Sequence, residues 1–227
     1  MANDGTGEER VMVDVWDWET RALHWINALL IITLALLMVG NEVMEGLGVA
    51  KPLRRPVKEL HAYLGYFFVA TFSLRILWAF VGNRYARWGD ILPCAREKWA
   101  AIVQTLRWYL GGFRGSPAPA KGHDPLASLF YIALFIVLAS QAVTGLLLAG
   151  AEFDMFPGTI FTAGMAESAA EAFAHGLEEV HEFGYFFIVI FLAAHLAGLV
   201  VHEIGEKKGL FSSMIHGRKY IPTDDNR

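Results

Sequence analysis

Four long apolar stretches divide the chain, and segments rich in charged residues separate them. The stretches cover residues 22–40, 60–81, 126–150 and 183–201. A helix of about 20 residues crosses a hydrocarbon core of roughly 30 Å, and each stretch is about that long. We therefore predict an all-α integral membrane protein, in which a single domain over residues 1–227 forms a four-transmembrane-helix bundle.

A shorter amphipathic pattern lies between the second and third stretches. Apolar side chains recur there at helical spacing, with polar and basic ones on the other side. The apolar positions are Trp99, Ile102, Val103, Leu106, Tyr109 and Leu110. The pattern predicts a cytoplasmic interfacial helix, although a loop helix packed on the bundle would have the same pattern. Asp124 and Pro125 resemble an N-cap followed by proline at the first helical position, which predicts the start of the third span.

The composition agrees with a membrane protein, because 55% of the residues are hydrophobic and the mean hydropathy is +0.37. The net charge of −4 matters less than its distribution. Residues 151–182 contain seven acidic residues and no Lys or Arg, whereas the second loop and the tail are basic. Since basic segments tend to stay in the cytoplasm, we expect a multi-pass protein of the bacterial inner membrane with both termini cytoplasmic. The basic first loop, around Arg54, contradicts this rule.

Cys94 is the only cysteine. The chain can therefore form no internal disulfide, no cysteine-ligated cluster and no CxxCH site for covalent haem. Any haem must be bound non-covalently.

Four histidines lie at membrane depth, where ionisable side chains are costly and are usually functional. They are His24, His61, His181 and His195. His181 and His195 are 14 residues apart, which places them within about 40° of one helix face and about 21 Å apart along the axis. One helix would thus present two ligands at opposite depths.

Depth gives each of these two histidines one partner. His24 begins the first span on the cytoplasmic side, and His61 begins the second span on the outer side. We therefore predict two non-covalent haem groups, with His24 and His195 holding the inner one and His61 and His181 the outer one. Two axial histidines leave iron no open position, which favours electron transfer over oxygen chemistry. The alternative is that these are core histidines hydrogen-bonded to neighbouring helices.

Other residues in the spans fit a haem protein less specifically. Arg75 stands 14 residues after His61 on the same helix face, so we expect it at the inner haem level, beside a propionate. Snorkelling to the cytoplasmic interface is the alternative. Small residues could let a macrocycle approach the backbone or could serve plain helix packing. They are Gly65, Gly145, Gly184 and Gly198.

Several short motifs follow one another in a specific order and spacing. They are Val15-Trp16-Asp17, Arg21 to Asn27 (RALHWIN), Glu59 to Gly65 (ELHAYLG), Arg75 to Arg87 (RILWAFVGNRYAR), Gly122 to Ala127 (GHDPLA), Val180 to Gly184 (VHEFG) and Met214 to Lys219 (MIHGRK). With these motifs the chain resembles the b-type cytochrome subunits of nickel-iron hydrogenases and the related bacterial cytochrome b561 proteins.

The resemblance implies two haem b groups on the four histidines, with a membrane quinone reacting near the inner haem. Asn27, Arg75, His123 and His202 are the candidates for binding quinone. It also implies a partner outside the cytoplasm, either a c-type cytochrome or a hydrogenase. We expect no nucleic-acid partner, and a homo-oligomer stays open.

Three functions therefore compete. The first is an electron-transfer subunit, or a component of a quinone-linked oxidoreductase, that links quinone to the outer partner. The second is a free-standing quinone oxidoreductase of the superoxide oxidase kind, and the third is a haem-free structural anchor. In the first case we expect the acidic outer segment to dock a basic partner, although it could be a solvated loop. The residues are Glu167, Glu171, Glu178 and Glu179.

Overall fold

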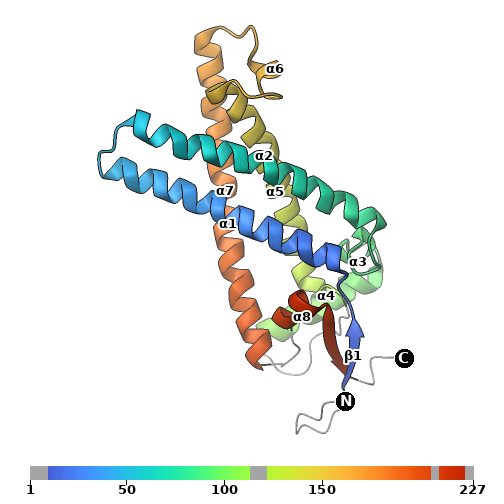
Figure 1. Cartoon of the computed structure of the whole chain (residues 1–227). Coiled ribbons are helices and arrows are strands. Elements are labelled where there is room, and N and C mark those ends of the chain that lie inside the picture. Colours follow the sequence, from blue (N-terminus) through green and yellow to red (C-terminus); the bar gives the residue numbers. More distant parts are fainter. Residues whose placement is uncertain (1–9, 113–121, 206–209, 223–227) are drawn as a thin grey trace. The chain divides into compact units, whose positions relative to one another are not determined.

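The computed structural model describes residues 10–112, 122–205 and 210–222, and Figure 1 shows the order of its elements. They are β1 (Arg10–Asp14), α1 (Trp18–Gly46), α2 (Lys51–Val81), α3 (Trp88–Ile91), α4 (Arg96–Leu110), α5 (Pro125–Phe153), α6 (Thr159–Thr162), α7 (Glu167–Gly205), α8 (Leu210–His216) and β2 (Arg218–Pro222). Within the described residues, α1, α2, α5 and α7 are long and apolar enough to cross a membrane. The four predicted spans are confirmed as helices, and each helix is longer than its apolar stretch.

The basic first loop is mostly helix, because α2 begins at Lys51 rather than near residue 60. A tight turn precedes it, in which Gly48 adopts a φ of +76° that favours glycine. The Arg54 guanidinium donates two hydrogen bonds to the Glu45 carboxylate, at 2.9 and 3.0 Å. This ion pair compensates the charge of Arg54 in the first turns of α2.

The chain divides into two compact units. Unit 1 contains residues 1–22, 75–134 and 191–227, and unit 2 contains residues 23–74 and 135–190. The boundaries fall within α1, α2, α5 and α7. The prediction of a single domain stays a prediction.

In unit 1, β1 and β2 form an antiparallel ribbon that pairs Arg10 with Pro222 and Asp14 with Arg218 (Figure 1). The ribbon continues into the Gly217 carbonyl, which accepts hydrogen bonds from the backbone of Val15 and Trp16, at 2.8 and 3.0 Å. The sequence analysis did not predict these strands, because their pairing joins residues about two hundred positions apart.

Asp17 fixes the start of α1 in unit 1. Its carboxylate accepts hydrogen bonds from the Thr20 backbone at 2.9 Å, the Trp78 indole at 3.3 Å and the Asn83 backbone at 3.2 Å. Burial alone would raise the pKa of Asp17, but these hydrogen bonds bring it below its ordinary value. One carboxylate thus caps α1 and ties it to the end of α2.

Two further helix predictions fall in unit 1 and are confirmed. Asp124 accepts hydrogen bonds from the backbone of Leu126 and Ala127, both at 2.9 Å, so it caps α5. The amphipathic segment forms α4, on which Ile102 is buried. An apolar stripe on the same helix stays exposed, as an interfacial helix requires. It contains Trp99, Val103, Leu106 and Leu110.

In unit 2, the segment after α5 folds back against that helix. Gly150 and Gly158 pack so closely that a Cβ on Gly158 would lie 2.8 Å from the Gly150 Cα. The Tyr66 hydroxyl of α2 donates a 2.6 Å hydrogen bond to the Phe156 carbonyl. Backbone contact and this hydrogen bond together fasten the segment to α5 and α2.

Candidate functional site

His61 of α2 and His181 of α7 face each other within unit 2. Their ring centroids are 6.2 Å apart, and the ring planes make an angle of 73°. The pair that was predicted to hold the outer haem is therefore together in the structure.

The Nδ1 atoms of both rings are bound by neutral protein groups. His61 Nδ1 lies 3.1 Å from the Leu34 carbonyl, to which it must donate a proton. The Thr144 hydroxyl lies 2.8 Å from His181 Nδ1 and uses its own proton on the Ser140 carbonyl, also at 2.8 Å. Thr144 therefore accepts from His181. Both rings are held as the tautomer whose Nε2 lone pair is available to a metal.

The spacing of the two rings fits one metal ion between them. A metal–imidazole bond is about 2.0–2.1 Å long, so two rings on opposite sides of an ion have centroids about 6 Å apart. Within the described part of the chain, no three His, Cys, Asp or Glu side chains converge to hold a metal. A tetrahedral site made of side chains alone is therefore not built here, whereas a macrocycle would supply the four remaining ligands of a bis-histidine haem.

Two of the predicted glycines bring α5 and α7 together. A Cβ on Gly145 would lie 3.3 Å from His181 Cε1, and one on Gly184 would collide with the Gln141 amide. That amide donates a 2.8 Å hydrogen bond to the His181 carbonyl. Gly145 and Gly184 thus serve the helix packing that positions His181, whereas Gly65 and Gly198 have no atom within 4 Å of such a Cβ.

The predicted inner pair is divided between the units. His24 belongs to unit 2, where its ring lies 5.4 Å from that of Trp25. His195 belongs to unit 1, where it stacks on Phe191 at 5.9 Å with an interplanar angle of 9°. Their pairing stays a prediction.

His123 lies in unit 1, in the loop before α5, and 15% of its side chain is exposed. The Asp90 carboxylate accepts hydrogen bonds from its ring Nδ1 at 2.7 Å and its backbone at 3.0 Å. Burial lowers the pKa of His123, although Asp90 acts in the opposite direction. Burial alone would raise the pKa of Asp90, but hydrogen bonds from His123 bring it below its ordinary value. The dyad is therefore a neutral imidazole that donates to a carboxylate.

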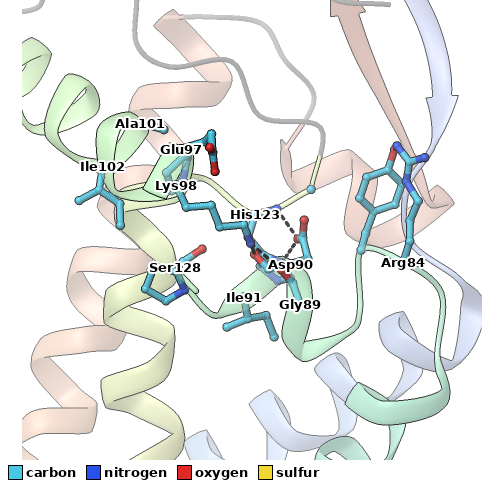
Figure 2. Close-up of a pocket in the computed structure, with 14 residues that line it drawn as sticks. Arg84, Gly89, Asp90, Ile91, Glu97, Lys98, Ala101, Ile102, His123 and Ser128 are labelled. Atoms are coloured by element: carbon cyan, nitrogen blue, oxygen red, sulfur yellow. Dashed lines mark hydrogen bonds and ion pairs between the residues drawn. The ribbon is translucent and has the colours of Figure 1, made fainter. Parts of the chain in front are cut away.

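This dyad lines a pocket of about 460 Å³, which we call the His123 pocket (Figure 2). Its wall also contains Arg84, Lys98, Ile102 and Ser128. The Lys98 ammonium donates to the carbonyls of Gly89 at 2.7 Å and Asp90 at 2.5 Å, so it closes the end of α3. The pocket thus places charged, polar and apolar side chains beside the dyad.

A row of aromatic rings connects His123 with His195 inside unit 1. The centroid of His123 lies 5.5 Å from that of Tyr131, Tyr131 lies 6.2 Å from Phe191, and Phe191 lies 5.9 Å from His195. The other side of His123 is covered by Trp16, at 4.9 Å. The structure thus joins a predicted haem ligand to the His123 pocket through continuous ring contacts.

The other quinone candidates have different surroundings. Asn27 donates to the Leu23 carbonyl at 2.8 Å and accepts from the Thr71 hydroxyl at 3.0 Å, so its amide links α1 to α2. Arg75 belongs to unit 1, where the Asp17 carboxylate acts on its charge. His202 lies in α7, but its side chain is outside the described residues.

The sequence analysis missed Thr144, Asp90 and Tyr131. Thr144 and Tyr131 look like ordinary residues of an apolar helix. Asp90 lies in the short helix α3, 33 residues before His123. Only Asp90 carried a signal, as an acid close to the second span.

A family model matches most of the chain. The model of the family described as "Prokaryotic cytochrome b561" matches residues 15–217. The chain belongs to the prokaryotic cytochrome b561 family. As a member of that family it is a multi-pass membrane protein and a b-type cytochrome, so haem b is its cofactor and electron transfer its role.

Three curated relatives carry the name of a hydrogenase cytochrome subunit, and two of them align over nearly all of this chain. A "Probable Ni/Fe-hydrogenase B-type cytochrome subunit" of Bradyrhizobium diazoefficiens is 28% identical and aligns over 96% of this chain and 92% of its own. A protein of the same name from Rhizobium leguminosarum bv. viciae is 30% identical over 96% of this chain and 95% of its own. The "Probable Ni/Fe-hydrogenase 1 B-type cytochrome subunit" of Escherichia coli K12 is 30% identical over 58% of this chain and 57% of its own.

Proposed function

We propose that this cytochrome carries two haem b groups and transfers electrons between a membrane quinone and a redox partner outside the cytoplasm. The observation that supports it best is the facing pair of His61 and His181, with each Nδ1 already bound to protein. Bis-histidine haem iron changes between ferric and ferrous states without binding substrate. His24 and His195 are the proposed ligands of the second haem.

The His123 pocket is the proposed place for the quinone headgroup. Oxidation of a quinol releases two protons along with two electrons, so the site needs a proton acceptor. With Nδ1 donating to Asp90, the Nε2 of neutral His123 provides one. The rings of Tyr131 and Phe191 continue from His123 to His195, the proposed haem ligand of unit 1.

The names of the relatives favour a nickel-iron hydrogenase as the outer partner, with a c-type cytochrome as the alternative. The proposed docking segment is the first part of α7, where Glu167, Glu171, Glu178 and Glu179 are exposed. Charge reversal at Glu167 and Glu171 should slow electron transfer to the partner and weaken its salt dependence. Electron transfer that responds neither to salt nor to these changes would contradict docking.

In the proposed membrane topology, both termini lie in the cytoplasm and the docking segment lies on the outer side. Reporter fusions to either end of the chain would test this topology.

Haem counting tests the proposed function directly. A pyridine haemochrome assay on purified protein should give two haem b per chain. His61→Ala and His181→Ala should each remove the same haem and leave the other spectrum intact, read per folded protein. His175→Ala is a matched control, because His175 is exposed on the same helix as His181. One haem per chain, or different haems lost from the two variants, would refute the proposal.

A further inference from the structure

Three charged side chains from three helices meet in unit 2. The Lys58 ammonium of α2 lies 3.6 Å from Glu152 Oε1 of α5. The side chain of Glu178 in α7 is close enough to Glu152 for the two carboxyl groups to share a hydrogen bond. We call Lys58, Glu152 and Glu178 the charge cluster.

The cluster lies one helical turn from the facing histidines. Lys58 precedes His61 by three residues, and Glu178 precedes His181 by three. Residues three apart share a helix face and are separated by about 4.5 Å along the axis. The charge of Lys58 acts directly on the His61 ring. A change of charge between the two histidines therefore reaches the cluster as well.

A hydrogen bond between two carboxyl groups needs a proton on one of them. With that proton, the cluster holds one positive and one negative charge, and without it two carboxylates repel each other. The proton belongs to the pair rather than to either residue. The side chains of Lys58 and Glu152 are 33% and 30% exposed, so water can deliver the proton.

Other charged groups also face the cluster. From α7, His175 acts on Glu178. From α2, Arg55 lies over the ring of Phe153, the residue after Glu152, at 5.7 Å. Arg55 is itself paired with Glu59 at 2.7 Å. His175 is the imidazole among these groups, so the test includes a variant that removes it.

We propose that the charge cluster binds one proton when the metal centre held by His61 and His181 gains one electron. The inference rests on the proposed function, because it needs a redox centre at that pair. The electron comes from a quinol or from a reduced redox partner, and the proton comes from water. The added negative and positive charges compensate each other, so reduction stabilises the protonated cluster and protonation favours reduction.

The test is a spectroelectrochemical titration of the purified protein with both haems bound, repeated between about pH 5 and pH 8. The haem that His61→Ala removes identifies the relevant absorbance. Its midpoint potential should fall as the pH rises, by at most about 59 mV per pH unit, the one-electron equivalent of a tenfold change. Glu178→Gln should flatten this dependence and raise the potential at the alkaline end of the pH range. The side chain at position 178 can then no longer add a second negative charge to the cluster.

Lys58→Met provides an independent second variant. Loss of its positive charge should lower the potential and move the pH-dependent region to higher pH. Two neighbours are matched controls: Glu179→Gln changes an exposed acid beside Glu178, and His175→Ala removes the nearby imidazole. Both should keep the pH dependence of the unmodified protein.

Several results would overturn the inference. A potential independent of pH would do so, as would the same slope in Glu178→Gln as in the unmodified protein. Loss of the slope in His175→Ala would assign the proton to that imidazole instead. If His61→Ala and His181→Ala removed no haem, both the proposed function and this inference would fail. If they removed one haem but the cluster variants did not change the pH dependence of its potential, the inference alone would fail.

Discussion

Two partly buried histidine systems in this protein differ in what binds Nδ1. In unit 2, Nδ1 of His61 and Nδ1 of His181 meet a carbonyl and a hydroxyl, which are neutral and hold the tautomer without titrating. In unit 1, Nδ1 of His123 meets the Asp90 carboxylate, which attracts a proton to the ring. The neutral acceptors favour a metal ligand, and the carboxylate favours a proton acceptor. The partner of Nδ1 therefore separates the two proposed roles.

The largest expected effect concerns the second haem. His24→Ala and His195→Ala should both remove the haem that His61→Ala retains, because an axial ligand is lost in each case. Reduced-minus-oxidised spectra, normalised to folded protein, would measure this. If His24→Ala and His61→Ala affected one common haem, the assignment of ligands by depth would be wrong.

The next effect tests the proton role of unit 1. His123→Gln should slow haem reduction by quinol by about a hundredfold or more, the usual loss for a general base. Reduction by dithionite and the haem content should stay unchanged, since His123 is not a proposed ligand. Stopped-flow absorbance with both reductants would separate these cases. Equal slowing with both reductants would contradict a role in quinol chemistry.

Asp90→Asn gives the matching pH experiment. His123 accepts a proton only when neutral, so quinol oxidation should be lost as the pH falls through its pKa. That pKa is already lowered by burial, and the Asp90 carboxylate raises it in part. Removing the carboxylate should therefore shift the acid limb of the pH–rate profile to still lower pH. An acid limb that stays in place would show that another group controls it.

A smaller effect is expected from Thr144→Val in unit 2. The variant keeps the shape of the side chain but leaves Nδ1 of His181 without its acceptor, so haem affinity should fall by about 10–100-fold. Haem retention during dilution would measure the loss. Thr33→Val is a matched control, because the Thr33 hydroxyl also bonds its own helix, at 2.8 Å, and is exposed. Similar loss in both variants would indicate a general helix effect.

The smallest effect concerns Asp17, which supports unit 1 without belonging to either histidine system. Asp17→Ala should destabilise the fold by about 0.5–2 kcal/mol, the usual cost of losing an N-cap. Because its pKa is depressed by folding, ionised Asp17 stabilises the protein above its ordinary pKa of 3.8. This contribution is lost as the pH falls through the lower folded value. Thermal unfolding at several pH values would test both statements, and a variant as stable as the unmodified protein would refute them.

Local sequence patterns predicted the helices well but did not predict the contacts between segments that are distant in the chain. The four spans, α4 and the Asp124 cap depend on residues within a few turns of one another, and all were found. α2 begins at Lys51, before its apolar stretch, and Arg54 in this extension is paired with Glu45 across a turn that a hydropathy pattern does not contain. The β1–β2 ribbon was missed for the same reason at much longer range.

By itself, the sequence determined which segments can cross a membrane and which histidines lie within or next to those segments, because hydropathy and helical periodicity are properties of neighbouring residues. The facing of His61 and His181 was predicted from their depth, and the structure brings the two rings together. Only the tertiary structure decided that Thr144 and Leu34 bind their Nδ1 atoms while Asp90 binds that of His123. The reason is geometric: a hydrogen-bond partner is selected by how two helices or loops cross, and the sequence does not specify a crossing locally.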